Sequence, residues 1–571
     1  MTKIKKSSLK INLSWIFVFT SLLVNHMLLK DQTFRNSLPL IQNIRYSDYL
    51  VQKWFLVSVS FVFLMWWIRR EQIFAKVKSM IPYILIIAIA TLIAHWFSFD
   101  RWFDFDDYRL IGHHRAVTDT PQYNTMGALN NPYYGYAFAY LVVRWFDATF
   151  NYYNTLGLFI LFLTGIFIFA LVNKLLKSKS IALVSALFFV TSSGYFRQIL
   201  QMHEFLGDSF PLLLFAISCF FLVSKFYSGS VIFAAASMEF GLSREHYIAL
   251  PLLLFGLLLV KEKIKRREFI LTLIMFPLLA IPYISVLQTY PPEIINKASW
   301  FSNWPQLVRI FDSIFAVTVP HLIAYPLIFA AHYVFPDIFA SSIFGISLII
   351  ILFLVAMFCL YRKKTEAFAT LFIGLTILGS AIVFPTLMGI RLVHNLPSLI
   401  RQYGDFIPAA PTSYGLPSTF GVALIVAGLG ATIKQRFFIP LAVILIVLNA
   451  GSTIKGDREW IKLFSYPQKA SNHQLANVIP YDGKVKVIYA HELLSRYVSY
   501  FYQLYRIKDP LYFTNDPEEF VRLIREKNPD KNHIYLLISE NSTYKVKDLS
   551  DSLRSTYPSF NANSVRSLIE E

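Results

Sequence analysis

Apolar and polar positions alternate along most of this chain in long blocks. Apolar runs of about 15–22 residues recur from residue 11 to residue 451, and short polar connections separate them. A helix of roughly 20 apolar residues crosses a bilayer and satisfies its own backbone groups there. The pattern therefore predicts thirteen spans, at 11–29, 51–68, 80–98, 153–173, 181–196, 206–224, 230–243, 246–260, 269–289, 339–360, 366–388, 417–433 and 437–451.

Basic residues gather in the connections on one side of these predicted spans. The segments 1–10, 69–79, 174–180, 225–229, 261–268, 361–365 and 434–436 together hold 22 Lys and Arg. Cytoplasmic loops have an excess of Lys and Arg, so these segments predict the cytoplasmic side and a cytoplasmic N-terminus. The long polar segments then lie outside, at 99–152, 290–338, 389–416 and 452–571.

The segment after residue 451 has the shorter periodicity of a soluble α/β domain. Strands are predicted at 484–490, 510–514 and 533–539, and a helix at 491–506. Another helix is predicted from Pro517, because Asp516 is a favourable N-cap residue and acidic residues follow in the first turn. These strands and helices predict a small domain of two or three layers.

The predicted fold is an all-α polytopic membrane protein with a small extracytoplasmic α/β domain at its C-terminal end. We expect an integral, multi-pass protein of the cell or inner membrane. Its predicted parts are 1–79, with two N-terminal spans; 80–451, the transmembrane core with external loop 99–152; and 452–571, the α/β domain.

Composition and charge narrow the class of protein. The chain is 55% hydrophobic and 15% charged, whereas soluble proteins have about 25% charged residues. Its net charge is +18, but 452–571 holds 17 basic against 15 acidic residues, so the excess lies in the membrane part. An excess of Lys and Arg in the cytoplasmic loops of a membrane protein explains this distribution, which therefore does not predict nucleic-acid binding. The two cysteines, both in apolar runs, predict neither a disulfide framework nor a metal site.

The first long external loop begins with acids set among aromatic residues, in "WFSFDRWFDFDDYRL" at 96–110. Asp106 and Asp107 are adjacent, and Tyr108 follows them. One interpretation is an interfacial loop with solvated carboxylates, since Trp and Tyr are common at the headgroup level. The other is a catalytic pair presented at the membrane surface.

Further charged residues are predicted on the same outer face. His203, Glu204 and Asp208 lie at the mouth of the sixth span; Asp208 could instead be a helix N-cap. The other candidates for substrate binding are Arg244, Glu245, Arg391 and Arg401. Arginine binds phosphate well because its planar fork donates two hydrogen bonds at once, although contact with lipid headgroups would also explain it.

The order of these features resembles the glycosyltransferases of the GT-C fold, such as protein O-mannosyltransferases and the aminoarabinose transferases of lipid A. An acidic pair opens the first long external loop. Arg197 to Phe215 then follows the pattern R…D-x-x-P-L-L-L-F, and a short hairpin of spans turns at Ser243-Arg244-Glu245. The resemblance covers about residues 80–435; the two spans before residue 80 depart from it.

The resemblance implies transfer of a sugar from a polyprenyl-phosphate carrier to a lipid, glycan or protein acceptor on the outer face. Asp106 or Asp107 would be the base that activates the acceptor, with Asp208 the next candidate. Arg244, Arg391 or Arg401 would stabilise the leaving phosphate, with Glu245, His203 and Tyr108 as further substrate-binding residues. No cofactor is required. A divalent cation is possible at Asp104-Phe105-Asp106, but two carboxylates alone do not predict a metal site.

Other classes of function remain open at the level of the sequence. An oligosaccharyltransferase should have a W-W-D-Y-G-like motif in its external tail, and "RQYGD" at 401–405 is only faintly similar to it. A transporter should show inverted repeats and charges within its spans, neither of which we find. A non-enzymatic envelope protein would keep the aromatic residues of the loop and not depend on its acids. The sugar and the acceptor are not predicted.

Overall fold

A computed structural model describes ten stretches of the chain and a few single residues in the first two predicted spans. The stretches are 79–102, 150–192, 202–240, 270–275, 350–387 with short gaps, 415–490, 509–529, 533–540, 543–549 and 561–570. Val498 is also described, and it is helical. All structural statements below concern these residues.

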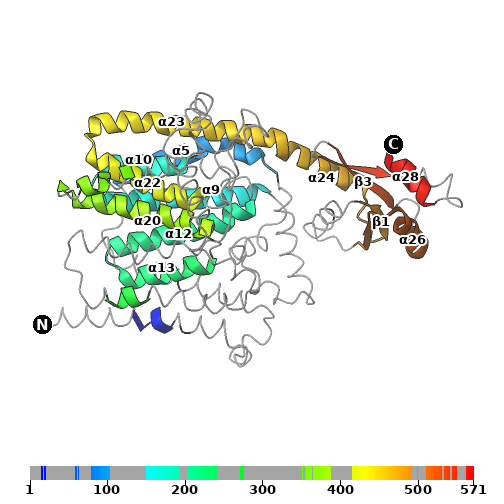
Figure 1. The fold of residues 1–571 in the computed structure, drawn as a ribbon, viewed down its shortest axis with the longest axis horizontal. Helices are drawn as coiled ribbons and strands as arrows, with labels where there is room; N and C mark the ends of the chain where they lie inside the picture. Colours follow the sequence, from blue (N-terminus) through cyan, green and yellow to red (C-terminus); the bar gives the residue numbers. More distant parts are fainter. Residues whose placement is uncertain are drawn as a thin grey trace.

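The described part is mostly helical, with one small sheet near the C-terminal end. Its helices lie side by side along the long axis of the molecule, and the sheet lies beyond one end of them (Figure 1). The helices are α5 (Ile81–Ala94), α9 (Phe150–Leu176), α10 (Lys179–Val190), α12 (Met202–Val223), α13 (Tyr227–Phe240), α20 (Thr365–Leu387), α22 (Gly415–Thr432) and α23 (Gln435–Trp460). Each overlaps a predicted span.

Two of these helices are long and apolar enough to cross a membrane, at Tyr152–Leu176 and Gln435–Arg458. Shorter apolar helices, such as Lys179–Val190 and Leu416–Thr432, pack beside them. The number of thirteen spans stays a prediction. Helix α23 corrects one boundary, because it passes the predicted span end at residue 451 and continues to Trp460. The π-helical segment η5 (Ile461–Ser465) and helix α24 (Tyr466–Val478) extend it towards the sheet.

Glycines allow α20 and α22 to approach each other closely. A Cβ atom added to Gly421 would lie 2.7 Å from the backbone nitrogen of Leu378 and 2.9 Å from the carbonyl oxygen of Gly374. Small residues at helix contacts are typical of membrane helices, where close van der Waals packing replaces the hydrophobic effect. Buried hydroxyl groups add bonds between helices, as where Ser185 Oγ donates to the carbonyl of Ala423 at 2.7 Å.

We expect Gly421→Ala to destabilise the helical part by about 1–3 kcal/mol, because the new methyl group forces two backbones apart. Gly379→Ala is the matched control, since a Cβ atom at Gly379 in α20 meets nothing within 4 Å. The control should be neutral or slightly stabilising, because alanine favours helix more than glycine does. Thermal unfolding of both variants in detergent measures the difference. Equal melting temperatures would contradict the close helix contact.

Three of the turns with predicted cytoplasmic basic residues lie together at one end of the helices. Gln435 Nε2 donates to Ser178 Oγ at 3.2 Å, which joins the turn before α23 to the turn before α10. Lys364 Nζ donates to the carbonyl of Thr432 at 3.2 Å, which adds the turn before α20. The start of α5 is also at this end, because the ammonium of Lys179 lies 5.6 Å from the ring centroid of Tyr83. We refer to this as the basic end.

Large apolar side chains are exposed along α5 and α23, which contact each other. On α23 the exposed side chains include Phe437, Leu441 and Ile444, and on α5 they include Leu85, Ile89 and Ile93. Contiguous apolar surface of this size is unusual on a soluble monomer and marks a surface that another apolar phase covers.

The small sheet is mixed, with strand order β2-β1-β3-β4. Strands β1 (Lys486–Tyr489), β2 (Leu511–Thr514) and β3 (Ile534–Glu540) are parallel, and β4 (Thr543–Asp548) is antiparallel to β3. These confirm the three predicted strands; β4 was not predicted. Helix α26 (Pro517–Lys527) begins as predicted, and Asp516 accepts a hydrogen bond from the backbone of Glu518.

Alternation of side chains makes this a three-layer domain. Val487, Ile534 and Leu536 point to one face, where they pack with the buried side chains of α26 and α28 (Ala562–Glu570). Ile488, Tyr535 and Leu537 point to the other face, where they join a core that includes Leu475 and Ile479 at the end of α24. Successive residues of a strand face opposite sides, so both faces of the sheet are apolar and both are covered. Of the predicted helix 491–506, only Val498 lies among the described residues.

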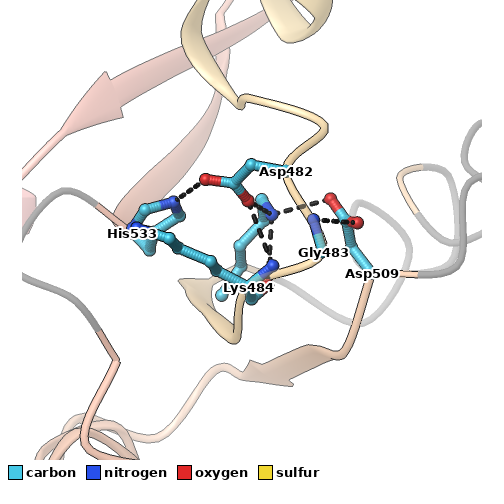
Figure 2. A network of polar contacts seen from close by, with 6 residues as sticks. Asp482, Gly483, Lys484, Asp509 and His533 are labelled. Carbon is cyan, nitrogen blue, oxygen red and sulfur yellow. Dashed lines mark hydrogen bonds and ion pairs between the residues drawn. The ribbon is translucent and has the colours of Figure 1, made fainter.

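A polar network lies at the amino ends of the parallel strands (Figure 2). The buried ammonium of Lys486 is 2.8 Å from Asp482 Oδ1 and 2.7 Å from Asp509 Oδ2. His533 Nε2 lies 2.6 Å from Asp482 Oδ2. Partial burial raises the pKa of Asp482, but the hydrogen bonds from Lys486 and His533 outweigh it and hold that pKa well below its usual value. Ligands of open α/β sheets bind at the carboxyl ends of strands, so we interpret this network as structural.

Lys486→Met should weaken the sheet by about 1.5–3 kcal/mol, because the variant removes hydrogen bonds between charged groups. Hydrogen exchange at the amides of β1 and β3 in the full chain measures the loss. Lys547→Met in β4 is the control, because Lys547 is exposed. The structural interpretation fails if the Lys486 and Lys547 variants exchange alike.

Candidate functional site at the start of the external loop

Most of the residues predicted for the site lie outside the described residues. These are Asp106, Asp107 and Tyr108 in the external loop, Arg244 and Glu245 in the turn after α13, and Arg391 and Arg401 after α20. The possible cation ligands Asp104 and Asp106 are also outside them. The structure therefore neither brings these residues together nor separates them.

Asp208 and His203 lie on helix α12. The backbone of this helix excludes the interpretation of Asp208 as an N-cap residue. The helix begins at Met202, so Asp208 is inside its first half and is not an N-cap residue. The helix therefore begins before residue 206, where the sixth span is predicted to start. The side chains of 202–208 are outside the described part.

The start of the external loop is described, and it is firmly held. Helix α5 ends at Ala94 rather than at the predicted residue 98, and a 3-10 helix, η1 (Trp96–Asp100), continues the chain. His95 Nε2 lies 3.0 Å from the carbonyl oxygen of Val190, at the end of α10. Ser98 Oγ accepts a hydrogen bond from Asn154 Nδ2 of α9 at 3.0 Å. Helices α9 and α10 therefore both hold this short segment.

The strongest contact of this segment is a buried ion pair. Arg101 Nη2 lies 2.5 Å from Asp457 Oδ1 of α23, and both side chains are at most 1% exposed. Two charges taken out of water need each other, because a buried charge without a partner costs several kcal/mol. The pair therefore ties the first residue after η1 to the last turn of α23.

The same turn of α23 is bonded to α10. Thr453, one turn before Asp457, donates through Oγ1 to the carbonyl of Thr191 at 3.1 Å. The end of α5, the start of α9, the end of α10 and the end of α23 thus meet at the end of the bundle opposite the basic end. We call this the loop end.

Trp102 then packs against α24, which leads to the C-terminal domain. Its ring is stacked on His473, with centroids 6.5 Å apart, and the ammonium of Lys469 lies 5.6 Å from its centroid. Asp106 and Asp107 follow Trp102 by four and five positions in the sequence and lie outside the described residues.

Sequence reasoning missed Arg101 and Asp457, although both are functional candidates for placing the loop. They are 356 positions apart, and no local spacing connects them. The sequence did contain an indication of their importance. Each is a charged residue at the end of an apolar run, and such a residue usually has a charged partner or a functional role. Among the residues that the structure describes, no group of three or more His, Cys, Asp or Glu could hold a metal ion.

No model of a known protein family matches the chain, and a search of curated proteins finds no match. The functional interpretation therefore depends on the residues and on the geometry of the loop end.

Proposed function

We propose that the chain is a multi-pass membrane enzyme that transfers a sugar from a polyprenyl-phosphate carrier to an acceptor on the extracytoplasmic face. Asp106 or Asp107 is the base, and one or more of Arg244, Arg391 and Arg401 binds the carrier phosphate. The donor class follows from the resemblance to GT-C glycosyltransferases. The acceptor is a lipid, a glycan or a protein.

Two structural features support the membrane orientation in this proposal. The turns rich in Lys and Arg at 177–178, 364 and 434–435 meet at the basic end, as a common cytoplasmic side requires. The start of the external loop, the end of α23 and the C-terminal domain lie at the other end (Figure 1). The N-terminus is then cytoplasmic, and the C-terminal domain is extracytoplasmic.

The observation that supports the site best is the anchoring of the external loop by Arg101 and Asp457. Catalytic groups on loops need a rigid support, because a displacement of about 1 Å can cost about 10²-fold in rate. Here the acids follow, in the sequence, a segment that is held by a buried ion pair to α23 and by hydrogen bonds to α9 and α10. An interfacial loop with merely solvated acids needs no such support.

The test is transfer by the purified chain in liposomes supplied with a polyprenyl-phosphate-linked sugar. We expect release of polyprenyl phosphate that increases with the amount of protein and with added acceptor lipids. A panel of hexose and pentose carriers identifies the sugar. Carrier that stays intact over the whole panel and with all three acceptor classes contradicts the proposal.

A further inference from the structure

One face of α23 changes from apolar to basic along its length. Its exposed side chains include Phe437, Leu441, Ile444 and Val447 in the first part. From Lys455 onward, the exposed side chains include four basic ones: Lys455 and Arg458 on α23, Lys462 on η5 and Lys469 on α24. We call these four residues the basic face. Positions three and four apart share a face of a helix, so Lys455, Arg458 and Lys462 continue the apolar stripe.

The length of the apolar part matches a bilayer. Arg436 at the start of α23 and Lys455 near its end are both exposed, and they bound a stretch that rises about 28 Å at 1.5 Å per residue. The hydrocarbon core of a bilayer is about 30 Å thick. The basic face therefore begins where the headgroup region of one leaflet begins.

Aromatic residues surround the basic face at this level. The guanidinium carbon of Arg458 lies 5.4 Å from the ring centroid of Phe97, and Lys469 lies over the ring of Trp102. Trp96 is 64% exposed and Tyr466 is 54% exposed. Exposed Trp and Tyr beside basic residues are typical of the membrane interface.

Basic residues outnumber acidic ones along 455–469. This segment holds the four residues of the basic face and two acids, Asp457 and Glu459, and Asp457 is buried and paired with Arg101. Segment η1, which contacts α23, adds one exposed carboxylate, Asp100. At a leaflet that contains anionic lipid, each Lys or Arg near the surface raises the affinity for that lipid by about five-fold.

We propose that the basic face binds the phosphate headgroups of anionic phospholipids in the leaflet at the loop end. The lipid acyl chains would lie against the apolar stripe of α23, and the phosphates would contact Lys455, Arg458, Lys462 and Lys469. Because α24 leads into the sheet, bound lipid would hold the C-terminal domain close to the membrane. The inference rests on membrane insertion, as proposed above, and not on sugar transfer.

The test is native mass spectrometry of the full chain in detergent, titrated with phosphatidylglycerol, with phosphatidylcholine or with inorganic phosphate, and without any sugar donor. One variant changes all four residues of the basic face to Gln. The control variant removes the same charge from the exposed tail residues Arg522, Arg525, Lys527 and Lys547, also to Gln.

We expect the parent chain and the control to retain phosphatidylglycerol in preference to phosphatidylcholine, and the basic-face variant to bind it on the order of 10²-fold more weakly. Arginine at the three lysine positions should keep the binding, because the charge is kept. Equal phosphatidylglycerol binding by both Gln variants overturns the proposal. Competition by inorganic phosphate at equal concentration also overturns it, because the site would then bind free phosphate.

Discussion

Asn at the proposed catalytic base, Asp106 or Asp107, should lower the rate of sugar transfer by about 10²–10⁴-fold. Asparagine keeps the size of the side chain and removes its basicity. In the proposed function the acids stand at the start of a loop on the outer face, where a polyprenyl phosphate would present its sugar. The other aspartate would orient the acceptor or the sugar. Its change to Asn should therefore lower the rate of transfer by a smaller factor.

The measurement is initial rate with purified polyprenyl-phosphate sugar, with each aspartate changed singly. Asp100→Asn is the matched control, because Asp100 is an exposed carboxylate at the end of η1 in the same acidic stretch. Circular dichroism and the melting temperature establish that each variant folds. Parent rates in both folded variants would exclude both residues as the base, and Asp208 would be tested next.

Asp457→Ala should destabilise the chain by about 3–5 kcal/mol, because it leaves the buried guanidinium of Arg101 without the carboxylate that lies 2.5 Å away. Arg101→Leu should cost a similar amount, since Asp457 then keeps a buried charge. The double variant Arg101→Leu/Asp457→Leu should recover most of the loss, because apolar residues often replace a buried ion pair without loss of stability. Thermal unfolding in detergent measures the three changes.

The double variant also distinguishes two roles of the ion pair, which are positioning the predicted external loop and stabilising the fold. If the pair positions the external loop, the double variant regains its melting temperature but keeps a lowered kcat, because the loop start is then held by packing alone. A double variant with parent stability and parent kcat would show that the pair is only structural. If each single variant has the same melting temperature as the parent chain, the buried ion pair between Arg101 and Asp457 is contradicted.

Much of the fold is determined by local patterns in the sequence. The helices α9 and α22 follow apolar runs of the kind that a helix satisfies in a membrane, and their predicted bounds agree with the structure within three residues. Helix α10 begins close to its predicted start but ends at Val190, six residues before the predicted end at 196. Helix α26 begins where Asp516 and Pro517 predict it, because a cap is a property of adjacent residues. The three parallel strands follow from apolar alternation between turns.

Other features were decided by contacts between distant segments. The early end of α5 and the length of α23 depend on neighbours far along the chain, which no window of sequence contains. Predictions at element boundaries are least secure for this reason. Strand β4 is different, because it pairs with the preceding strand β3 across a two-residue connection and was a local feature that the sequence analysis missed.

In the candidate site, too, some features follow from local sequence and others from contacts between distant segments. The sequence by itself determined where acids follow an apolar run, and it predicts on which side of the membrane the basic turns lie, because both depend on neighbouring residues and on the bilayer. Only the tertiary structure placed Arg101 against Asp457, since a buried ion pair forms when two helix ends meet. The pairing energy of two desolvated charges depends on their distance in space, and sequence separation does not report that distance.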